Sequence, residues 1–445
     1  MNEIILPEKV EEVLNNFKRK KYQIYVVGGA IRDIVLGRPT YDWDFTTDAT
    51  PDEILQVLPD GFYDNIYGTV GLTIEGFEKP FEITTFRTER GYSDSRRPDS
   101  VAWGKTLEED LLRRDFTINA LAYDGSKVID LYQGLKDIDK KIIRAVGNAD
   151  ERFREDALRM LRAVRIAGEL GFMIEEETLY AIQKNTSLIN RIAKERIKDE
   201  LFKILKGSNP HLGFSRLKES GLMQEILPEL SKCFGVEQKS PGRHHIYDVG
   251  THLMLSLKEC KSDDPVTRLA TLIHDIGKPQ TYKKLESGVI TFYNHEMVST
   301  KIANNIADRL RFSSKEKDKL VKLVRFHQFT VDEHQTDSAI RRFIRNIGPE
   351  NINDMLSLRV ADRLGGGARE TSWRLEEFKK RLIEVQKQPF SINDLKIDGN
   401  DVMKILKIKP GPKVGQILEK VFKEVEEKTI ENDRDVLLKR LSEIS

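Results

Sequence analysis

The chain has 445 residues, of which 39% are hydrophobic and 33% are charged, and this length favours two to four domains. No stretch approaches the roughly 18 consecutive apolar residues of a membrane-spanning helix, so the composition excludes an integral membrane protein. With 73 basic and 72 acidic side chains the net charge is +1, which excludes a polycation and requires any nucleic-acid surface to be confined to one face.

The N-terminal segment and the cysteines both favour a cytoplasmic protein. The first 20 residues are amphipathic and carry both signs of charge, which fits neither a signal peptide nor a transit peptide. The two cysteines, Cys233 and Cys260, lack the paired spacing of a zinc or redox site.

Short strands and helices are predicted to alternate over the first 150 residues. Apolar, β-rich runs predict strands at Gln23–Val27, Asp42–Thr46, Val70–Ile74 and Phe81–Phe86. Helical patterns are expected around Pro7–Lys20 and Pro51–Leu58. From Glu151 onward strand signals nearly vanish, and successive amphipathic helices follow. The predicted fold is an α/β head followed by an all-α remainder.

The first candidate site follows the first predicted strand. That strand runs into Gly28-Gly29 and then into a helix near Ala30, a turn that lets backbone N–H groups approach a phosphate. Asp42 and Asp44 lie two apart on the next strand and project from the same face. Such paired carboxylates can hold two divalent metals for phosphoryl transfer. The alternative is a solvated strand edge. Glu82 is either a third carboxylate ligand or a satisfied strand residue.

A helical pattern over Glu155–Arg165 carries the second candidate site. Asp156 and Arg159 are three apart and can point at one object. An arginine donates to N3 of cytosine or N1 of adenine, and an aspartate accepts from N4 or N6. Uracil and guanine present the reversed edge, at a cost of roughly 1–3 kcal/mol for each buried mismatch. The pair therefore predicts selection of C and A. An ordinary surface helix with an ion pair is the alternative.

Taken together, these motifs resemble a known family. Gly28-Gly29-x-x-Arg32-Asp33 with Asp42-x-Asp44 resembles the catalytic signature of the DNA polymerase β nucleotidyltransferase superfamily, and more narrowly that of bacterial-type (class II) CCA-adding enzymes and poly(A) polymerases. Arg113–Ala120, Ile129–Val146 and Glu195–Leu205 are similar to further motifs of that family, the last interpreted as a structural brace.

The resemblance implies roles for particular residues. It assigns catalysis and Mg²⁺ binding to Asp42 and Asp44, and the position of Glu82 on its strand makes it the candidate for a third metal ligand. It assigns nucleotide binding to a larger set, in which Asp156 and Arg159 act as a protein template: Gly28, Gly29, Arg32, Arg113, Asp156, Arg159, Arg162 and Arg165. On an ideal helix Arg165 points away from Asp156, so we expect it to reach another part of the nucleotide.

Seven of the eight histidines lie between His244 and His334, which indicates a local chemical role. His245, His252, the pair His274-Asp275, His295 and Asp362 resemble a metal-dependent phosphohydrolase domain of the His-Asp (HD) type. The predicted ligands of this second site, for another divalent metal, are His252, His274, Asp275 and Asp362.

Two further segments bear on tRNA. Residues 394–418 resemble the family's C-terminal signature, and Lys407, Lys409 and Lys413 lie near a predicted helix start, where they can contact phosphate. Arg87–Asp99 is polar and shows neither helical nor strand period, so a surface loop is expected. In the family a flexible loop here is associated with the switch from C to A addition.

The predicted protein is a four-part tRNA nucleotidyltransferase. Its parts are a catalytic head (1–148), a base-reading neck (149–210), a body with the HD-type site (211–370) and a tRNA-binding tail (371–445). It adds CCA to tRNA from CTP and ATP without a nucleic-acid template, with no membrane partner. The alternatives are A-only addition, C-only addition (which the loop disfavours), poly(A) synthesis, and, more distantly, an HD-type phosphohydrolase or an RNA chaperone.

Overall fold

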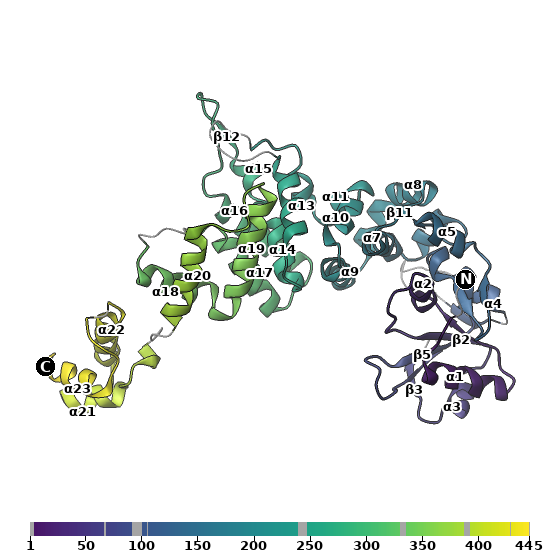
Figure 1. The fold of residues 1–445 in the computed structure, drawn as a ribbon, viewed down its shortest axis with the longest axis horizontal. Coiled ribbons are helices and arrows are strands. Elements are labelled where there is room, and N and C mark those ends of the chain that lie inside the picture. Colours follow the sequence, from purple (N-terminus) through teal and green to yellow (C-terminus); the bar gives the residue numbers. More distant parts are fainter. Residues whose placement is uncertain are drawn as a thin grey trace. The chain divides into compact units, whose positions relative to one another are not determined.

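A computed structural model describes residues 4–65, 68–90, 100–104, 106–238, 247–329, 335–386, 392–427 and 429–444. The chain divides into two compact units, drawn in Figure 1. The first comprises Met1–Val236 with Asn305–Ser313, and the second comprises Glu237–Asn304 with Ser314–Ser445. Over the described ranges, none of the helices combines the length and the apolar character needed to cross a membrane.

The first unit begins with a mixed sheet of seven strands in the order β3-β4-β5-β2-β1-β8-β9. The central pair β2 and β5 is parallel, and the other neighbours are antiparallel. The strands are β1 (Ile24–Val27), β2 (Asp44–Thr47), β3 (Phe62–Asn65), β4 (Thr69–Leu72), β5 (Phe81–Thr85), β8 (Leu121–Tyr123) and β9 (Val128–Asp130). The four predicted strands are confirmed with small shifts of their ends, and β3, β8 and β9 were not predicted.

The helices of the head bury one face each. In α1 the buried residues Val10, Val13, Leu14 and Phe17 recur at helical spacing. Helix α3 starts at Pro51 behind a capping box formed by Thr50 and Glu53, which explains its sharp beginning. The helices are α1 (Glu8–Arg19), α2 (Gly29–Val35), α3 (Pro51–Val57), α4 (Leu107–Leu112), the 3₁₀ turn η1 (Thr117–Asn119) and α5 (Gly134–Lys140).

One prediction for the head is wrong. Arg87–Arg90 was expected to lie in a loop without strand period, but it forms strand β6, which pairs antiparallel with β7 (Ser100–Trp103). Backbone pairing with a partner ten residues away supplies the strand that the polar side chains do not indicate. The remainder of the expected loop, residues 91–99, lies outside the described residues.

The neck continues the first unit with packed helices. They are α6 (Ala149–Glu155), α7 (Leu158–Leu170), α8 (Glu176–Asn185), the 3₁₀ turn η2 (Thr186–Arg191), α9 (Lys194–Lys206), α10 (Pro210–Glu219), α11 (Leu222–Ile226) and α12 (Pro228–Ser231), with a parallel pair of short strands, β10 (Ile142–Ile143) and β11 (Met173–Ile174). Helix α7 packs closely on α10, since a Cβ added to Gly168 would lie 2.5 Å from the Cα of Gly213.

The continuous helix predicted over Glu155–Arg165 is broken. Helix α6 ends at Glu155 and α7 begins at Leu158, with Asp156 in extended backbone between them. The Asp156 carboxylate accepts a hydrogen bond from the backbone N–H of Leu158 at 3.0 Å. A short acidic side chain that bonds its own backbone competes with helix in this way, and the apolar period alone does not reveal it.

The second unit is almost wholly helical. Its body contains α13 (Val249–Glu259), α14 (Pro265–Ile273), α15 (Lys278–Thr281), the hairpin β12–β13 (Lys283–Lys284, Ile290–Thr291), α16 (His295–Arg309, which belongs to the first unit from Asn305 onward), α17 (Ser314–Phe326), α18 (Asp337–Ile347), the 3₁₀ turn η3 (Pro349–Asn351), α19 (Ile352–Gly365) and α20 (Trp373–Gln386). Helix α19 lies directly against α13, where a Cβ on Gly365 would meet the Ser256 side chain at 2.3 Å.

The tail has a small core of its own. Helices α21 (Gly399–Leu406), α22 (Pro412–Glu426) and α23 (Arg434–Glu443), with the 3₁₀ turn η4 (Ile392–Asp394), bury an apolar cluster that includes Val402, Val421 and Leu437. The predicted turn and helix start at Pro410–Pro412 is confirmed, because α22 begins at Pro412. The boundaries predicted at residues 148, 210 and 370 remain predictions.

Candidate active site

A polar cleft of about 720 Å³ opens in the first unit, between the head and the neck helices α7 and α9. It gathers seven of the predicted site residues, contributed by the turn after β1, by α2, by the segment that leads into β2 and its first residue, and by α7: Gly28, Gly29, Arg32, Asp42, Asp44, Arg162 and Arg165. Its other charged lining residues include Lys79, Arg114, Asp115 and Lys203. The lining thus combines carboxylates, which can hold a metal, with cations that suit an anionic ligand.

Gly28 shapes this cleft. Its φ of 78° is a conformation that L side chains rarely adopt. A Cβ at this position would lie 3.3 Å from a guanidinium nitrogen of Arg114 and 3.4 Å from Oδ2 of Asp44. The glycine therefore leaves room for the Arg114 guanidinium beside the Asp44 carboxylate.

The two predicted catalytic carboxylates have different surroundings. Asp44 is the half-buried first residue of β2, whereas Asp42 precedes the strand, is exposed, and pairs with Lys79 at 2.6 Å. The prediction that both aspartates lie on the strand is therefore wrong for Asp42, because the pairing of β2 with β1 and β5 begins only at Asp44. Burial raises the pKa of the Asp44 carboxyl; Arg114 opposes this rise and the neighbouring Asp42 adds to it. Glu82 pairs in register with Asp44 on the adjacent parallel strand β5, so their side chains share a face of the sheet. The half-buried Asp44 carboxylate thus has the exposed carboxylates of Asp42 and Glu82 as neighbours, and like charges placed together favour a bound cation.

A buried hydrogen-bond network ties the head to α7. Arg32 donates to Oδ1 of Asn119 at 2.8 Å, and Asn119 donates to Oδ1 of Asp115 at 3.0 Å. The other oxygen of Asp115 accepts from Arg162 at 2.7 Å. Burial raises the pKa of Asp115, but Arg162 and Asn119 together lower it by more, so that the pKa is about 2. Asp115 thus stays ionised and fixes Arg162 at the cleft.

Sequence reasoning selected Arg113, while the structure places its neighbour Arg114 in the cleft. Arg113 donates to Oδ1 of the buried Asp110 at 2.6 Å. Arg114 contacts the second oxygen of Asp110 at 3.3 Å and lines the cleft. Because α4 ends at Leu112, the side-chain directions of the following residues depend on the turn that follows and were not predictable from helical period. Lys79, Asp115 and Asn119 were also missed as site residues, although the last two lie within the quoted motif Arg113–Ala120.

Neither residue of the predicted base-reading pair is among the described residues that line the cleft. Asp156 accepts from Arg196 of α9 at 3.0 Å. Arg159 donates to Glu155 at 2.6 Å and to the backbone carbonyl of Arg113 at 3.0 Å. The side chains of Asp156 and Arg159 are therefore each paired with another protein group.

Helix α9 braces the neck through side chains as well as packing. Besides the Arg196–Asp156 contact, Glu200 accepts from Arg165 at 2.7 Å. Burial raises the pKa of Glu200, but Arg165 and Lys203 lower it below its ordinary value. The segment interpreted from sequence as a structural brace thus binds two of the predicted nucleotide-binding residues directly.

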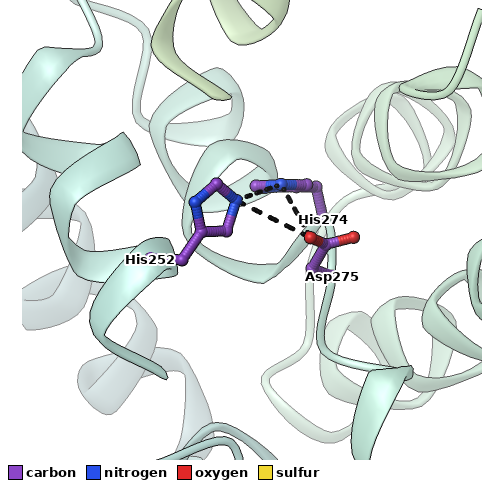
Figure 2. Close-up of side chains that lie close together, drawn as sticks. All are labelled: His252, His274 and Asp275. Atoms are coloured by element: carbon purple, nitrogen blue, oxygen red, sulfur yellow. Dashed lines mark hydrogen bonds and ion pairs between the residues drawn. The ribbon is translucent and has the colours of Figure 1, made fainter. Parts of the chain in front are cut away.

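The second unit contains a separate buried cluster of histidines and aspartates. His252 on α13 and His274 after α14 approach within 3.2 Å through their Nε2 atoms, and Asp275 lies beside both (Figure 2). Asp362 on α19 approaches His252 at 3.2 Å and His274 at 3.5 Å. The four predicted ligands of the HD-type site therefore converge from three helices. His245 lies outside the described residues.

Charge in this cluster is tightly coupled. Burial lowers the pKa of His274, but the carboxylates of Asp275 and Asp362 raise it more, to about 10. Burial raises the pKa of Asp275, but Lys278 and His274 hold it well below its ordinary value. Two ionised carboxylates in such a site require positive charge nearby. Two further buried histidines, His295 and His327, face Asp275. Neither was among the predicted ligands, although both fall in the histidine-rich stretch.

The chain is similar to known proteins over almost its whole length. Residues 24–144 match the family described as "Poly A polymerase head domain", residues 171–234 match "Probable RNA and SrmB- binding site of polymerase A", and residues 288–441 match "tRNA nucleotidyltransferase domain 2". The CCA-adding enzyme of Ligilactobacillus salivarius is 34% identical over 98% of this chain and 96% of its own length. That of Pediococcus pentosaceus is 32% identical over 99% of each.

A solved structure has the same fold. The CCA-adding enzyme of Bacillus stearothermophilus, crystallised in complex with CTP, is 27% identical and superposes with a TM-score of 0.74, covering 99% of this chain and 98% of the other.

Proposed function

The chain belongs to the CCA-adding enzyme family, and on that premise we propose a role for each part of its site. The protein is a tRNA nucleotidyltransferase that adds CCA to the 3′ end of tRNA, using CTP and ATP without a nucleic-acid template. Its family uses divalent metal for this reaction. The names of the relatives favour full CCA addition over the A-only and poly(A) alternatives and over an HD-type phosphohydrolase as the principal activity.

The observation that carries the site proposal is the cleft in which Asp42 and Asp44 face Arg114 and Arg162. We assign the two aspartates as ligands of Mg²⁺, with Glu82 beside Asp44 as a third carboxylate. The residues fit a metal chemically, since the half-buried Asp44 carboxylate has the carboxylate of Asp42 as a neighbour. Bound there, the metal supplies a lowered pKa for the attacking 3′-hydroxyl and stabilisation of the leaving pyrophosphate.

The other residues of the cleft orient the nucleotide. Arg114 and Arg162, held by Asp110 and Asp115, present fixed guanidinium groups to the triphosphate. Gly28 and Gly29 admit its phosphates close to the backbone. Arg32 holds Asn119 and Asp33 and so keeps the floor of the cleft rigid. Arg113 acts indirectly: it binds the Asp110 carboxylate, which also holds Arg114 in place.

Base selection requires an exchange of partners in the neck. Asp156 and Arg159 read C and A through the donor and acceptor pattern given above. To reach a base, Asp156 releases Arg196 and Arg159 releases Glu155, each a partly buried ion pair of the neck. Arg165, held by Glu200, lies on the cleft side and contacts another part of the nucleotide. Arg196 is therefore a positioning residue for Asp156.

For the remaining parts we propose a cytoplasmic enzyme with head, neck, body and tail divided at residues 148, 210 and 370. The tail contacts tRNA phosphates through Lys407, Lys409 and Lys413. Lys413 lies in the first turn of α22, where free backbone N–H groups add to the attraction for phosphate.

One assay tests the assignment of all three additions. Labelled CTP and ATP are offered separately to tRNA ending at the discriminator base, at C and at CC. We expect CTP to extend the first two and ATP to extend the third. Addition of A alone to the CC end makes the enzyme an A-only transferase, and repeated A addition to any end makes it a poly(A) polymerase.

A second activity is favoured by the buried cluster of the second unit. We propose that His252, His274, Asp275 and Asp362 hold a divalent metal for hydrolysis of a phosphate ester. The fit rests on convergence of two imidazoles and two carboxylates, all largely buried, on ligand atoms within 3.6 Å of His252 Nε2. Imidazole with carboxylate suits Mn, Fe or Ni. When bound, such a metal supplies a polarised phosphoryl oxygen and an activated water.

A further inference from the structure

Lys79 lines the cleft of the first unit, and its partner differs in kind from those of the arginines there. The Nζ atom of Lys79 lies 2.6 Å from Oδ2 of Asp42. The Lys79 side chain is 58% exposed and the Asp42 side chain is 56% exposed. Lys79 therefore pairs with a proposed metal ligand, at a place where ion pairs exchange at low cost.

The parallel pairing of β2 with β5 brings Lys79 to Asp42. Asp44 pairs in register with Glu82, so the segments that lead into the two strands arrive at the same edge of the sheet. Asp42 lies two residues before Asp44, and Lys79 lies three residues before Glu82. The backbone N–H of Glu82 also donates to the carbonyl of Trp43 at 3.1 Å, which continues the contact beyond the start of β2. The fold thus sets the ammonium group against the carboxylate.

The backbone at Lys79 is anchored, while its side chain is left in solvent. The ring of Phe77 meets that of Phe81 edge to face at 4.8 Å between centroids, and Phe81 packs on Phe45 of β2 at 5.7 Å. Lys79 lies between Phe77 and Phe81 in the chain, so these rings hold its Cα near the sheet. A flexible four-carbon stem on an anchored Cα lets the ammonium group change partners without movement of the backbone.

The two arginines assigned to the triphosphate depend on other carboxylates. Arg114 is held by Asp110 and Arg162 by Asp115, and these carboxylate side chains are 0% and 9% exposed. Neither aspartate is a proposed metal ligand, so both arginines keep their partners when metal binds. Lys79 loses its partner, because an ammonium group and a divalent cation repel one another and compete for the same carboxylate oxygens.

The charge of Lys79 acts on the second catalytic aspartate as well. Burial raises the pKa of the Asp44 carboxyl, and Arg114 and Lys79 act against this rise. The ammonium group thus supplies part of the positive charge that the neighbouring carboxylates of Asp42 and Asp44 need. A divalent cation at these carboxylates takes over that task, and the ammonium group is then available to an anion in the cleft.

We propose that Lys79 moves from Asp42 to the phosphates of the incoming CTP or ATP when a divalent cation binds in the cleft. The proposal rests on the metal assignment above and adds a nucleotide-binding residue to it. Lys79 competes with the metal before the nucleotide binds and contacts the triphosphate afterwards. It serves both nucleotides alike, because an ammonium group binds phosphate as a point charge and reads no base.

The test measures metal and nucleotide affinities separately in the full-length protein without tRNA. Mn²⁺ binding is followed by electron paramagnetic resonance, and the part of the binding curve that Asp44→Asn removes is assigned to the cleft. CTP and ATP binding are followed by equilibrium dialysis at saturating Mg²⁺. Lys79→Met should lower the Kd of the cleft for Mn²⁺ by about 2–5-fold, because the competing charge is gone. It should raise the Kd for CTP and for ATP by about 3–10-fold, because a hydrogen bond to phosphate is lost.

Two further variants serve as controls. Lys79→Arg keeps the positive charge and should hold each Kd within about threefold of the unsubstituted value. Lys184→Met is the matched control, since Lys184 is 53% exposed, pairs with Asp150 at 3.4 Å and is not among the described residues that line the cleft. It should leave every Kd unchanged. Lys79→Gln replaces Lys79→Met should circular dichroism show that the methionine variant has unfolded.

The opposite signs of the two shifts separate the proposal from a structural effect, because damage to the cleft weakens metal and nucleotide together. Any result for a folded Lys79→Met or Lys79→Gln variant that lacks either shift overturns the proposal. Asp44→Asn judges the metal assignment by itself. If it removes no bound Mn²⁺, the assignment fails and the proposal fails with it. If it removes Mn²⁺ while the Lys79 variants shift neither Kd, the assignment stands and the role of Lys79 alone is overturned.

Discussion

The cleft of the first unit and the cluster of the second bring acids and nitrogen ligands together in opposite ways. In the cleft the Asp42 side chain is 56% exposed, and most cations are long side chains held by ion pairs. In the cluster the Asp275 side chain is 5% exposed, and three imidazoles are locked by backbone carbonyls. Ion pairs near solvent exchange at low cost, whereas buried ligands locked by backbone do not.

This difference fits the two kinds of task. A site that accepts CTP, ATP and a growing RNA end benefits from side chains that change partners, as Asp156 and Arg159 must. A site whose ligands bind only a metal ion benefits from ligand positions that are fixed before the ion arrives.

The largest effect is expected in the cleft. Asp42→Ala or Asp44→Ala should lower nucleotide addition by at least ~10³-fold, equivalent to about 4 kcal/mol of transition-state stabilisation. tRNA affinity should stay nearly unchanged, because contacts to the RNA backbone supply it. Single-turnover CTP incorporation and a filter-binding assay measure the two quantities. Incorporation within tenfold of the unsubstituted enzyme in either variant contradicts the metal assignment.

Removal of the histidine–aspartate cluster of the second unit should not affect nucleotide addition at the cleft. His274→Ala with Asp275→Ala should abolish metal binding by the second unit and any phosphatase or 2′,3′-cyclic phosphodiesterase activity. CTP and ATP incorporation should stay within about threefold, because every described residue that lines the cleft belongs to the first unit. A folded variant that loses incorporation as fully as hydrolysis shows that the two sites are coupled.

Exchange of partners in the neck is tested by Arg159→Ala. The variant should raise KM for both CTP and ATP and reduce discrimination against UTP and GTP by about 5–150-fold, which corresponds to roughly 1–3 kcal/mol. Steady-state competition between the four nucleotides provides the measurement. Arg154→Ala, whose side chain is 59% exposed, is the control and should retain selectivity. If Arg159→Ala keeps its selectivity, base recognition must be assigned to another residue, such as Arg162.

The smallest effect concerns stability of the neck that carries these arginines. Gly168→Ala places a Cβ 2.5 Å from the Cα of Gly213 and should destabilise the first unit by about 1–3 kcal/mol. Gly415→Ala, at an open position in the first turn of α22, meets nothing within 4 Å and should be neutral or stabilising by up to about 1 kcal/mol. Urea unfolding compares the two. Equal midpoints would show that α7 and α10 separate easily.

The sequence by itself determined the local elements and the residues with a fixed spacing. The strands around Val27 and Phe45 follow from apolar runs, and α3 follows from its capping residues. Asp42 with Asp44, and His274 with Asp275, are marked by position along the chain and by family resemblance. These features depend on neighbours within a few residues, which a single sequence displays.

Tertiary structure decided which side chains meet. It placed Arg114 and not Arg113 in the cleft, ended α6 before Asp156, and gave Asp156 to Arg196, forty residues away. It also brought His295 and His327 to Asp275 from separate helices. Periodicity tells which face of a helix is apolar, but not against which distant element that face packs. Contacts between distant residues depend on the directions of several helices at once, and only the folded chain sets those directions.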